Sequence, residues 1–111
     1  MIEEISFEYF QKVDIRIGTI IEANDFPKAR KPAYQLKIDF GDLGVKKSSA
    51  QITDLYTKED LLNRQIMAIV NFSPRQIANF MSECLVLGVV DDDSVVLLKP
   101  DSKTDNGLRI A

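Results

Sequence analysis

The side chains best suited to binding chemistry lie in residues 66–88, where a polar and aromatic stretch separates two apolar runs. Ser73 can cap a helical turn here, Pro74 fits the first position of that turn, and Gln76 can reach back to the cap. The pattern therefore predicts a capped single turn that is held between two buried strands. We expect this turn to present several polar and aromatic side chains together: Arg75, Gln76, Phe80, Ser82 and Glu83.

The composition argues against catalysis. The chain has no histidine, which excludes a Ser–His or Cys–His pair, a histidine base and a standard zinc site. Its one cysteine, Cys84, stands in the apolar run ECLVLGVV, where a cysteine is expected to be a small buried residue rather than a nucleophile. The three aspartates at 91–93 fit a solvated turn better than a cation site. We therefore expect no enzyme activity and no metal.

Length and patterning predict one domain spanning residues 1–111, since 111 residues suffice for a single core. The chain has no apolar run of about 18 residues, and its acidic start, MIEEISFEYF, lacks the order of a signal peptide. We therefore expect a cytoplasmic protein without membrane insertion. It also contains no glycine-rich loop that would bind phosphate, so we expect no nucleotide cofactor.

The charges are unevenly distributed. The formal net charge is −3, yet residues 28–47 carry six cations against Asp39 and Asp42. Two interpretations stay open: a locally basic binding face, or lysines that protect exposed sheet edges. The cations of this segment are Lys28, Arg30, Lys31, Lys37, Lys46 and Lys47.

The rest of the chain reads as short strands with two short helices. Ser6 can cap a helix that ends near Lys12, and Thr57 with Asp60 resembles a capping box that opens a second helix. Alternating apolar residues predict strands over 13–24 and 33–40, with a change of phase after Gly18 that is typical of a bulge or bend. Further strands are expected over 43–52, 66–72, 84–90 and 95–98.

This order predicts an all-β protein. Five short strands, with one helix between the third and fourth, fit the oligonucleotide/oligosaccharide-binding (OB) fold, which is a five-stranded Greek-key barrel. We expect a short N-terminal helix in addition. Ligands of this fold usually bind the face of strands two and three, which here would carry Lys37, Lys46 and Ser48.

Three segments resemble the tRNA-binding domain family, which includes the C-terminal domain of methionyl-tRNA synthetases. These segments are VDIRIGTI, AQITDLYTKEDLLNRQIMAIVNFSPRQI and SECLVLG. The stretches FPKARKPAYQLKIDFG and KKSSAQIT are most similar to its CsaA-type secretion chaperones. That resemblance implies a small homodimer that binds presecretory polypeptides in the cytoplasm and assists the Sec export machinery.

Some residues depart from the tRNA-binding pattern. Where tRNA-binding members have serine, any residue, glycine and methionine, this chain has Ser82, Glu83, Cys84 and Leu85. Glu83 would place a negative charge beside any phosphate at Ser82, which costs on the order of 1 kcal/mol in high dielectric. A glycine of the family is replaced by Asn79, and a small-residue–glycine pair by Ala50-Gln51. These departures favour a peptide-binding tip.

We therefore expect an ATP-independent chaperone for unfolded or presecretory polypeptides. Peptide contacts are predicted for Gln51, Arg75, Gln76, Phe80, Met81, Ser82 and Glu83. Cations at Arg30, Lys31, Lys46 and Arg75 would attract acidic segments of a client. The alternative is structure-specific tRNA binding through Arg30, Lys31, Lys37, Lys46, Lys47 and Ser82.

The chain ends carry apolar residues that need a partner. A helix of two turns is not stable alone, so its aromatic side must pack against the barrel or a second subunit. The predicted contacts of a homodimer are Phe7, Tyr9, Phe10 and Ile110.

Overall fold

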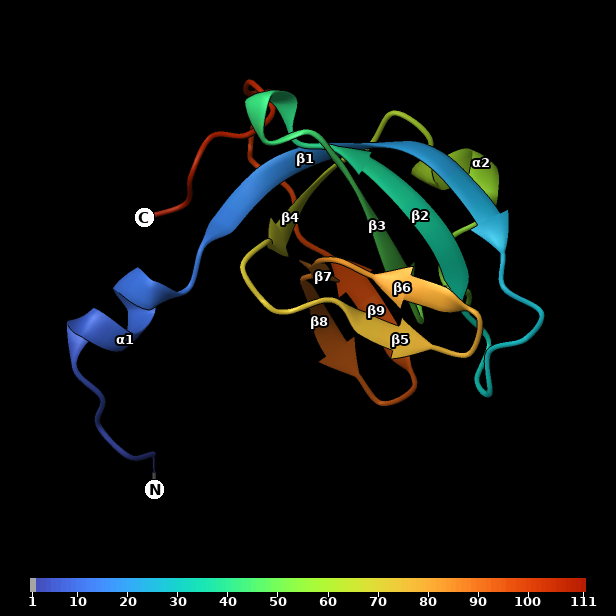
Figure 1. Cartoon of the computed structure of the whole chain (residues 1–111), viewed down its shortest axis with the longest axis horizontal. Helices are drawn as coiled ribbons and strands as arrows, with labels where there is room; N and C mark the ends of the chain where they lie inside the picture. The colour runs from blue at the N-terminus through green and yellow to red at the C-terminus, as the bar shows by residue number, and fades with distance from the viewer. Residues whose placement is uncertain (1) are drawn as a thin grey trace.

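Five antiparallel strands form the main sheet, in the order β3-β2-β1-β4-β7 (Figure 1). The structure is a computed structural model that describes residues 2–111. The sheet curls into a nearly closed barrel, as expected of an all-β, OB-like fold. Its strands are β1 (Ile15–Asp25), β2 (Tyr34–Asp39), β3 (Val45–Ala50), β4 (Gln65–Ile69) and β7 (Leu85–Val86).

Strand β1 is long and pairs with two neighbouring strands. Its first half pairs with β4 and its second half pairs with β2. The register shifts between Ile20 and Glu22, which confirms the predicted change of phase. At Gly18, a Cβ atom would lie 2.6 Å from Cγ2 of Ile38 and 2.7 Å from Cε1 of Phe40. Glycine is therefore required at this position, because side chains of the barrel interior occupy the space that a Cβ atom would need.

The core fills the barrel with aliphatic and aromatic side chains. The four apolar residues that alternate along β2 and its end are all buried: Tyr34, Leu36, Ile38 and Phe40. Cys84 belongs to the same buried cluster, as its apolar surroundings predict. Strands β2 and β3 therefore have a defined inner face, and their other residues point outward.

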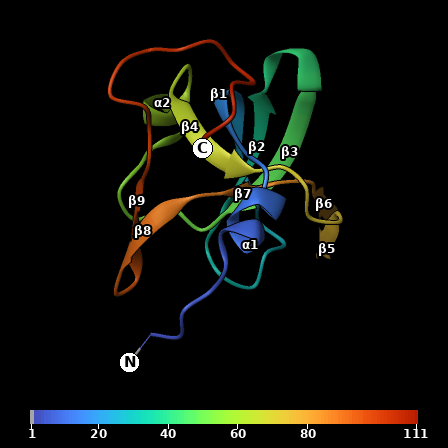
Figure 2. The same cartoon turned by 90° about the vertical axis from the view of Figure 1, so that its left-hand side faces the viewer.

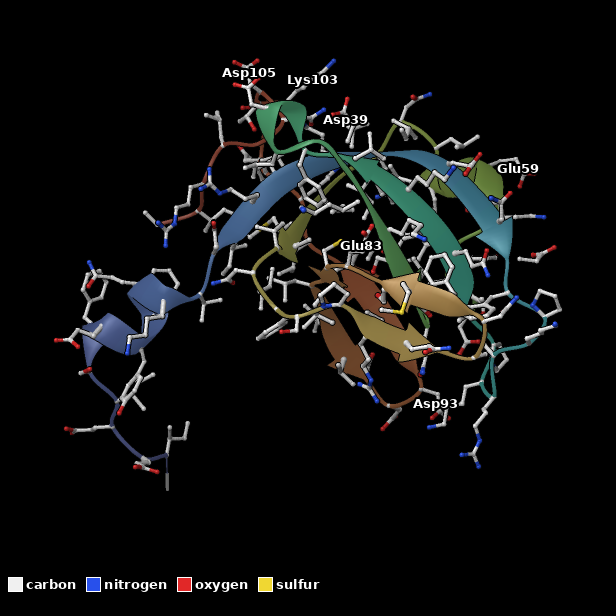
Figure 3. The ribbon with its side chains drawn as sticks, in the orientation of Figure 1. Asp39, Glu59, Glu83, Asp93, Lys103 and Asp105 are labelled. Atoms are coloured by element: carbon white, nitrogen blue, oxygen red, sulfur yellow. The ribbon has the colours of Figure 1, made fainter. Side chains whose placement is uncertain are left out.

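Backbone and side-chain hydrogen bonds close the barrel at the edge of β3, near Glu83 (labelled in Figure 3). The Glu83 amide donates to the carbonyl of Lys47 at 2.7 Å, and the Lys47 amide donates to the Glu83 carboxylate at 2.9 Å. The amide of Ser49 donates to Oγ of Ser82 at 3.1 Å. Ser48 is buried and donates to the carbonyl of Cys84 at 3.0 Å. A carboxylate and a hydroxyl thus replace part of a backbone ladder.

Two hairpins extend from the barrel, one formed by β5 (Arg75–Ile77) and β6 (Phe80–Ser82), the other by β8 (Gly88–Asp91) and β9 (Ser94–Leu97). The capped single turn predicted at Ser73 is therefore wrong. Residues of β5 pair one-to-one with residues of β6, and Ala78 makes the tight turn at φ 52°. Cross-strand pairing satisfies backbone groups that a single helical turn would leave open.

The strand predicted over 84–90 is divided into β7 and β8. Gly88 begins β8, and a Cβ atom there would lie 2.4 Å from Cγ1 of Val95. The close approach of β9 at this point accounts for the glycine. The strands predicted over 43–52 and 66–72 are each shorter than expected, and a 3-10 turn, η1 (Gly41–Leu43), precedes β3.

Both predicted helices are present, as α1 (Phe7–Lys12) and α2 (Lys58–Leu61). Thr57 and Asp60 form the predicted capping box of α2, with hydrogen bonds in both directions. Ser6 precedes α1 but its side chain makes no capping hydrogen bond. Within residues 2–111, no helix has the length and apolar character needed to cross a membrane.

The C-terminal tail crosses the end of the barrel and returns to β1 (Figure 2). The side chain of Gln65 holds the backbone of Thr104 through two hydrogen bonds of 2.7 and 3.1 Å. Beyond it, Gly107 and Ile110 donate backbone hydrogen bonds to the first residues of β1. The tail therefore extends the barrel wall beside the first half of β1.

Candidate functional site

A groove of about 1040 Å³ lies between the β5–β6 hairpin and the far end of β3. Its lining also includes the loop after β1 and parts of β7, β8 and β9. Three of the predicted peptide-binding residues come together here: Gln51, Arg75 and Gln76.

Burial separates the floor of the groove from its rim. The floor includes the buried side chains of Ala33, Ala50 and Ile52. The rim is exposed and carries Arg30, Lys31, Gln51, Arg75 and Gln76. An apolar floor under a polar and cationic rim can bind an apolar group and orient it by hydrogen bonds.

Several apolar residues of the groove were not predicted from the sequence, among them Ile52, Val86, Val90 and Val95. Val90 is 76% exposed. It lies in a strand whose sequence pattern, taken alone, does not show which of the two faces is buried. The signal was the unbroken apolar run on both sides of the Asp91–Ser94 turn, since such a hairpin exposes one apolar face.

Of the remaining predicted peptide contacts, Phe80, Ser82 and Glu83 have partners within the chain. Phe80 packs on the buried Phe26 with ring centroids 5.5 Å apart, and Nζ of Lys47 lies 5.3 Å from the Phe80 ring centroid. Ser82 and Glu83 bind the edge of β3, as described above. Met81 is 40% exposed and lies opposite Gln76 in the hairpin. Phe80, Ser82 and Glu83 therefore position the hairpin, while Met81 and Gln76 point outward.

The Cys84 thiol is expected to be a poor nucleophile. Burial raises the pKa of Cys84 to about 11, and the hydrogen bond with Ser48 only partly offsets this effect. A thiol with such a pKa carries almost no thiolate at neutral pH.

The predicted RNA-binding cations do not share one face. Arg30 and Lys31 lie at the groove, whereas Lys37 and Lys47 are paired across β2 and β3. Nζ of Lys37 forms an ion pair with Glu22 at 3.3 Å. Lys46 lies opposite the buried Ile38 in the β2–β3 register, on the face away from Lys47. The groove cations therefore form a group separate from the strand cations.

The predicted dimer contacts lie at the chain ends. Helix α1 stands away from the barrel and buries none of its residues (Figure 1). Phe7 and Tyr9 are 69% and 58% exposed, and Phe7 contacts Phe10 at a ring distance of 6.0 Å. Ile110 is half-buried against the start of β1. Within the described residues, the exposed aromatic side chains of α1 therefore form an apolar surface that no other element covers.

A charge cluster anchors α1 to the barrel. Arg16 binds the Asp14 carboxylate at 2.6 Å, and Nε of Arg109 lies 3.7 Å from the same carboxylate. The Arg16 hydrogen bond is the main reason that the pKa of Asp14 is lowered. Arg109 also donates to the carbonyl of Gln11 in α1, at 2.7 Å. Arg109 thus links the C-terminal tail to α1.

A second cleft, of about 620 Å³, lies at the opposite end of the barrel. Its lining mixes both signs of charge, with Asp60 and Asp101 beside Arg64, Lys99 and Lys103. Lys103 lies far from Asp93 at the tip of the β8–β9 hairpin (Figure 3). This cleft contains none of the residues predicted for the site.

The sequence model of the family described as "Putative tRNA binding domain" matches residues 15–109, which include the whole barrel. This chain belongs to that family. The structure of the chaperone CsaA from Bacillus anthracis is 51% identical, with a TM-score of 0.94 over 98% of this chain and 100% of that one. The CsaA chaperone protein from Picrophilus torridus is 55% identical, with a TM-score of 0.93 over 97% of this chain and 100% of that one.

Methionine–tRNA ligases are also related to the chain. The ligase from Thermococcus onnurineus is 37% identical over 98% of this chain. The alignment covers only 15% of the ligase, so the chain corresponds to a small part of that enzyme. The resemblance to CsaA chaperones and to the tRNA-binding domain, expected from the sequence motifs, is confirmed.

Proposed function

We propose that this protein binds unfolded or presecretory polypeptides in the groove, as an ATP-independent cytoplasmic chaperone that assists export. The observation that carries the proposal is the groove's buried aliphatic floor beneath an exposed rim of amides and cations. The structural similarity to CsaA chaperones over the full length of those chains supports it. A partner in the Sec export machinery would receive the bound client.

Two neighbouring valines provide a matched test. Val90 lines the groove, whereas Val89 lies outside its lining and is 54% exposed. Loss of one apolar contact is worth about 1 kcal/mol, or about fivefold in affinity. We expect Val90→Ser to weaken binding of a fluorescent, unfolded presecretory peptide about fivefold, while Val89→Ser leaves it unchanged. Equal effects of the two variants would reject the groove as the site.

We also propose that the protein acts as a homodimer. The exposed aromatic face of α1 supports this, because Phe7 and Tyr9 bury little against their own barrel. Sedimentation of a variant with Phe7→Ser and Tyr9→Ser should give a monomer that retains the folded circular dichroism spectrum. An unchanged dimer would remove α1 from the interface. Two grooves in one dimer would raise the apparent affinity for a long client.

Structure-specific tRNA binding is the second candidate function. The family match favours it, and Arg30, Lys31 and Arg75 provide cations on one rim. Phosphate contacts weaken steeply as salt rises, whereas apolar peptide capture does not. The chaperone proposal fails if tRNA binds with a steep salt dependence, Lys31→Glu abolishes that binding, and peptide does not bind.

A further inference from the structure

The sign of charge at the groove is opposite to that of the whole chain. The chain has a formal net charge of −3, yet the described lining of the groove contains three cations and no aspartate or glutamate. These cations are Arg30, Lys31 and Arg75. Across residues 2–111, none of the three takes part in an ion pair, whereas Arg16, Lys37, Lys58 and Arg109 do. The groove cations are therefore available to a ligand.

The apolar lining is aliphatic throughout. It consists of alanine, valine, leucine and isoleucine side chains, and the described lining residues include no aromatic ring. Phe26 and Phe80 lie nearby but pack on each other rather than line the groove. Single-stranded nucleic acids depend on aromatic side chains for base stacking, so this groove offers bases no platform. Aliphatic side chains of a polypeptide suit it better.

Strand β5 supplies a free edge beside this surface. Within the described residues, β5 pairs only with β6, and its three residues all line the groove. An extended peptide can add to such an edge through backbone hydrogen bonds, with alternate side chains directed to either side. Gln51 and Gln76 can hydrogen-bond the same backbone from the rim.

From the groove's charge, its aliphatic lining and the free β5 edge, we propose that the preferred client segment is an extended stretch in which carboxylates alternate with aliphatic residues. This inference rests on the proposed chaperone function and names its substrate class. The aliphatic side chains of the client would enter the floor near Ala50 and Ile52. Its carboxylates would meet Arg30, Lys31 and Arg75 at the rim.

Three synthetic peptides of twelve residues test the inference directly. They share the same valine positions and carry Glu, Gln or Lys at the alternate positions. An exposed ion pair contributes about twofold in affinity, and several together about tenfold. We expect the Glu peptide to bind about tenfold more tightly than the Gln peptide at low salt, and the Lys peptide to bind most weakly.

A charge reversal distinguishes the groove from general attraction. The double variant Lys31→Glu, Arg75→Glu should invert the order, so that the Lys peptide binds best. Its matched control, Lys99→Glu with Lys103→Glu, changes the net charge equally but lies at the second cleft. The control should keep the original order. Circular dichroism confirms that both variants are folded.

The outcomes separate the two proposals. Equal affinity for the three peptides would overturn the acidic preference and leave peptide binding intact. Binding of none of them, and of no presecretory peptide, would overturn both. An order that both double variants invert equally would show nonspecific charge attraction, which also overturns the inference.

Discussion

Removal of the Glu83 carboxylate should open the barrel at the edge of β3. In Glu83→Ala the backbone bond from residue 83 to the Lys47 carbonyl can remain, but the Lys47 amide loses its acceptor at 2.9 Å. A hydrogen bond to a charged group is worth about 1.5–3 kcal/mol. Glu83 is half-buried, so water replaces part of this bond. We expect a loss of about 1–2 kcal/mol in the free energy of unfolding.

The matched variant Glu83→Gln keeps an acceptor oxygen and should cost less, about 0.5–1 kcal/mol. Glu4→Ala removes the same charge from the exposed N-terminal segment and should cost almost nothing. Urea unfolding measures these differences, and the loss in Glu83→Ala should lower Tm by about 4–10 °C. The comparison isolates the hydrogen bond from the effect of net charge.

Amide exchange gives the local readout. A loss of 1–2 kcal/mol corresponds to a factor of about 5–30 in an opening equilibrium, so the Lys47 amide should exchange faster by about that factor in Glu83→Ala. Amides in the β1–β4 ladder should change less. Unaltered Lys47 exchange, or equal losses in the alanine and glutamine variants, would refute side-chain closure of the barrel.

Three further predictions follow from packing and titration. Gly18→Ala should destabilise the protein by about 1–3 kcal/mol in urea, because its Cβ would overlap Ile38 and Phe40; a neutral effect would contradict this packing. The Thr57 hydrogen bonds lower the pKa of Asp60 below 3.8, so its stabilising effect is present above that pH and is lost as pH falls through the folded pKa. The stability gap between the protein and Asp60→Asn should therefore close in acid titrations, and a constant gap would exclude the capping carboxylate as its cause. Cys84, whose pKa is raised from 9.0 to about 11, should react slowly with Ellman's reagent at pH 8 and rapidly in urea, and stability should fall as pH rises from 9 towards 11. Rapid labelling of the native protein would show that the thiol is accessible.

Local patterns predicted the elements whose determinants lie close together in sequence. The alternation through Tyr34, Leu36, Ile38 and Phe40 defined the inner face of β2, because side chains of a strand point alternately to its two faces. Thr57 and Asp60 defined the start of α2, since a capping box involves residues only three apart. In contrast, Ser73 and Pro74 matched a helical cap but precede a hairpin, whose pairing depends on residues 80–82.

The sequence by itself determined the class of fold, the inward residues and the family, because each of these depends on short-range patterns. The tertiary structure decided which polar side chains line the groove and which are bonded within the chain. Ser82 and Glu83 resemble a binding tip in sequence, yet they hydrogen-bond to β3, which lies over thirty residues earlier. Arg75, Arg30 and Val90 come from three distant segments and meet only when the barrel closes. Burial and long-range hydrogen bonds depend on chain topology, so no local pattern could assign these roles.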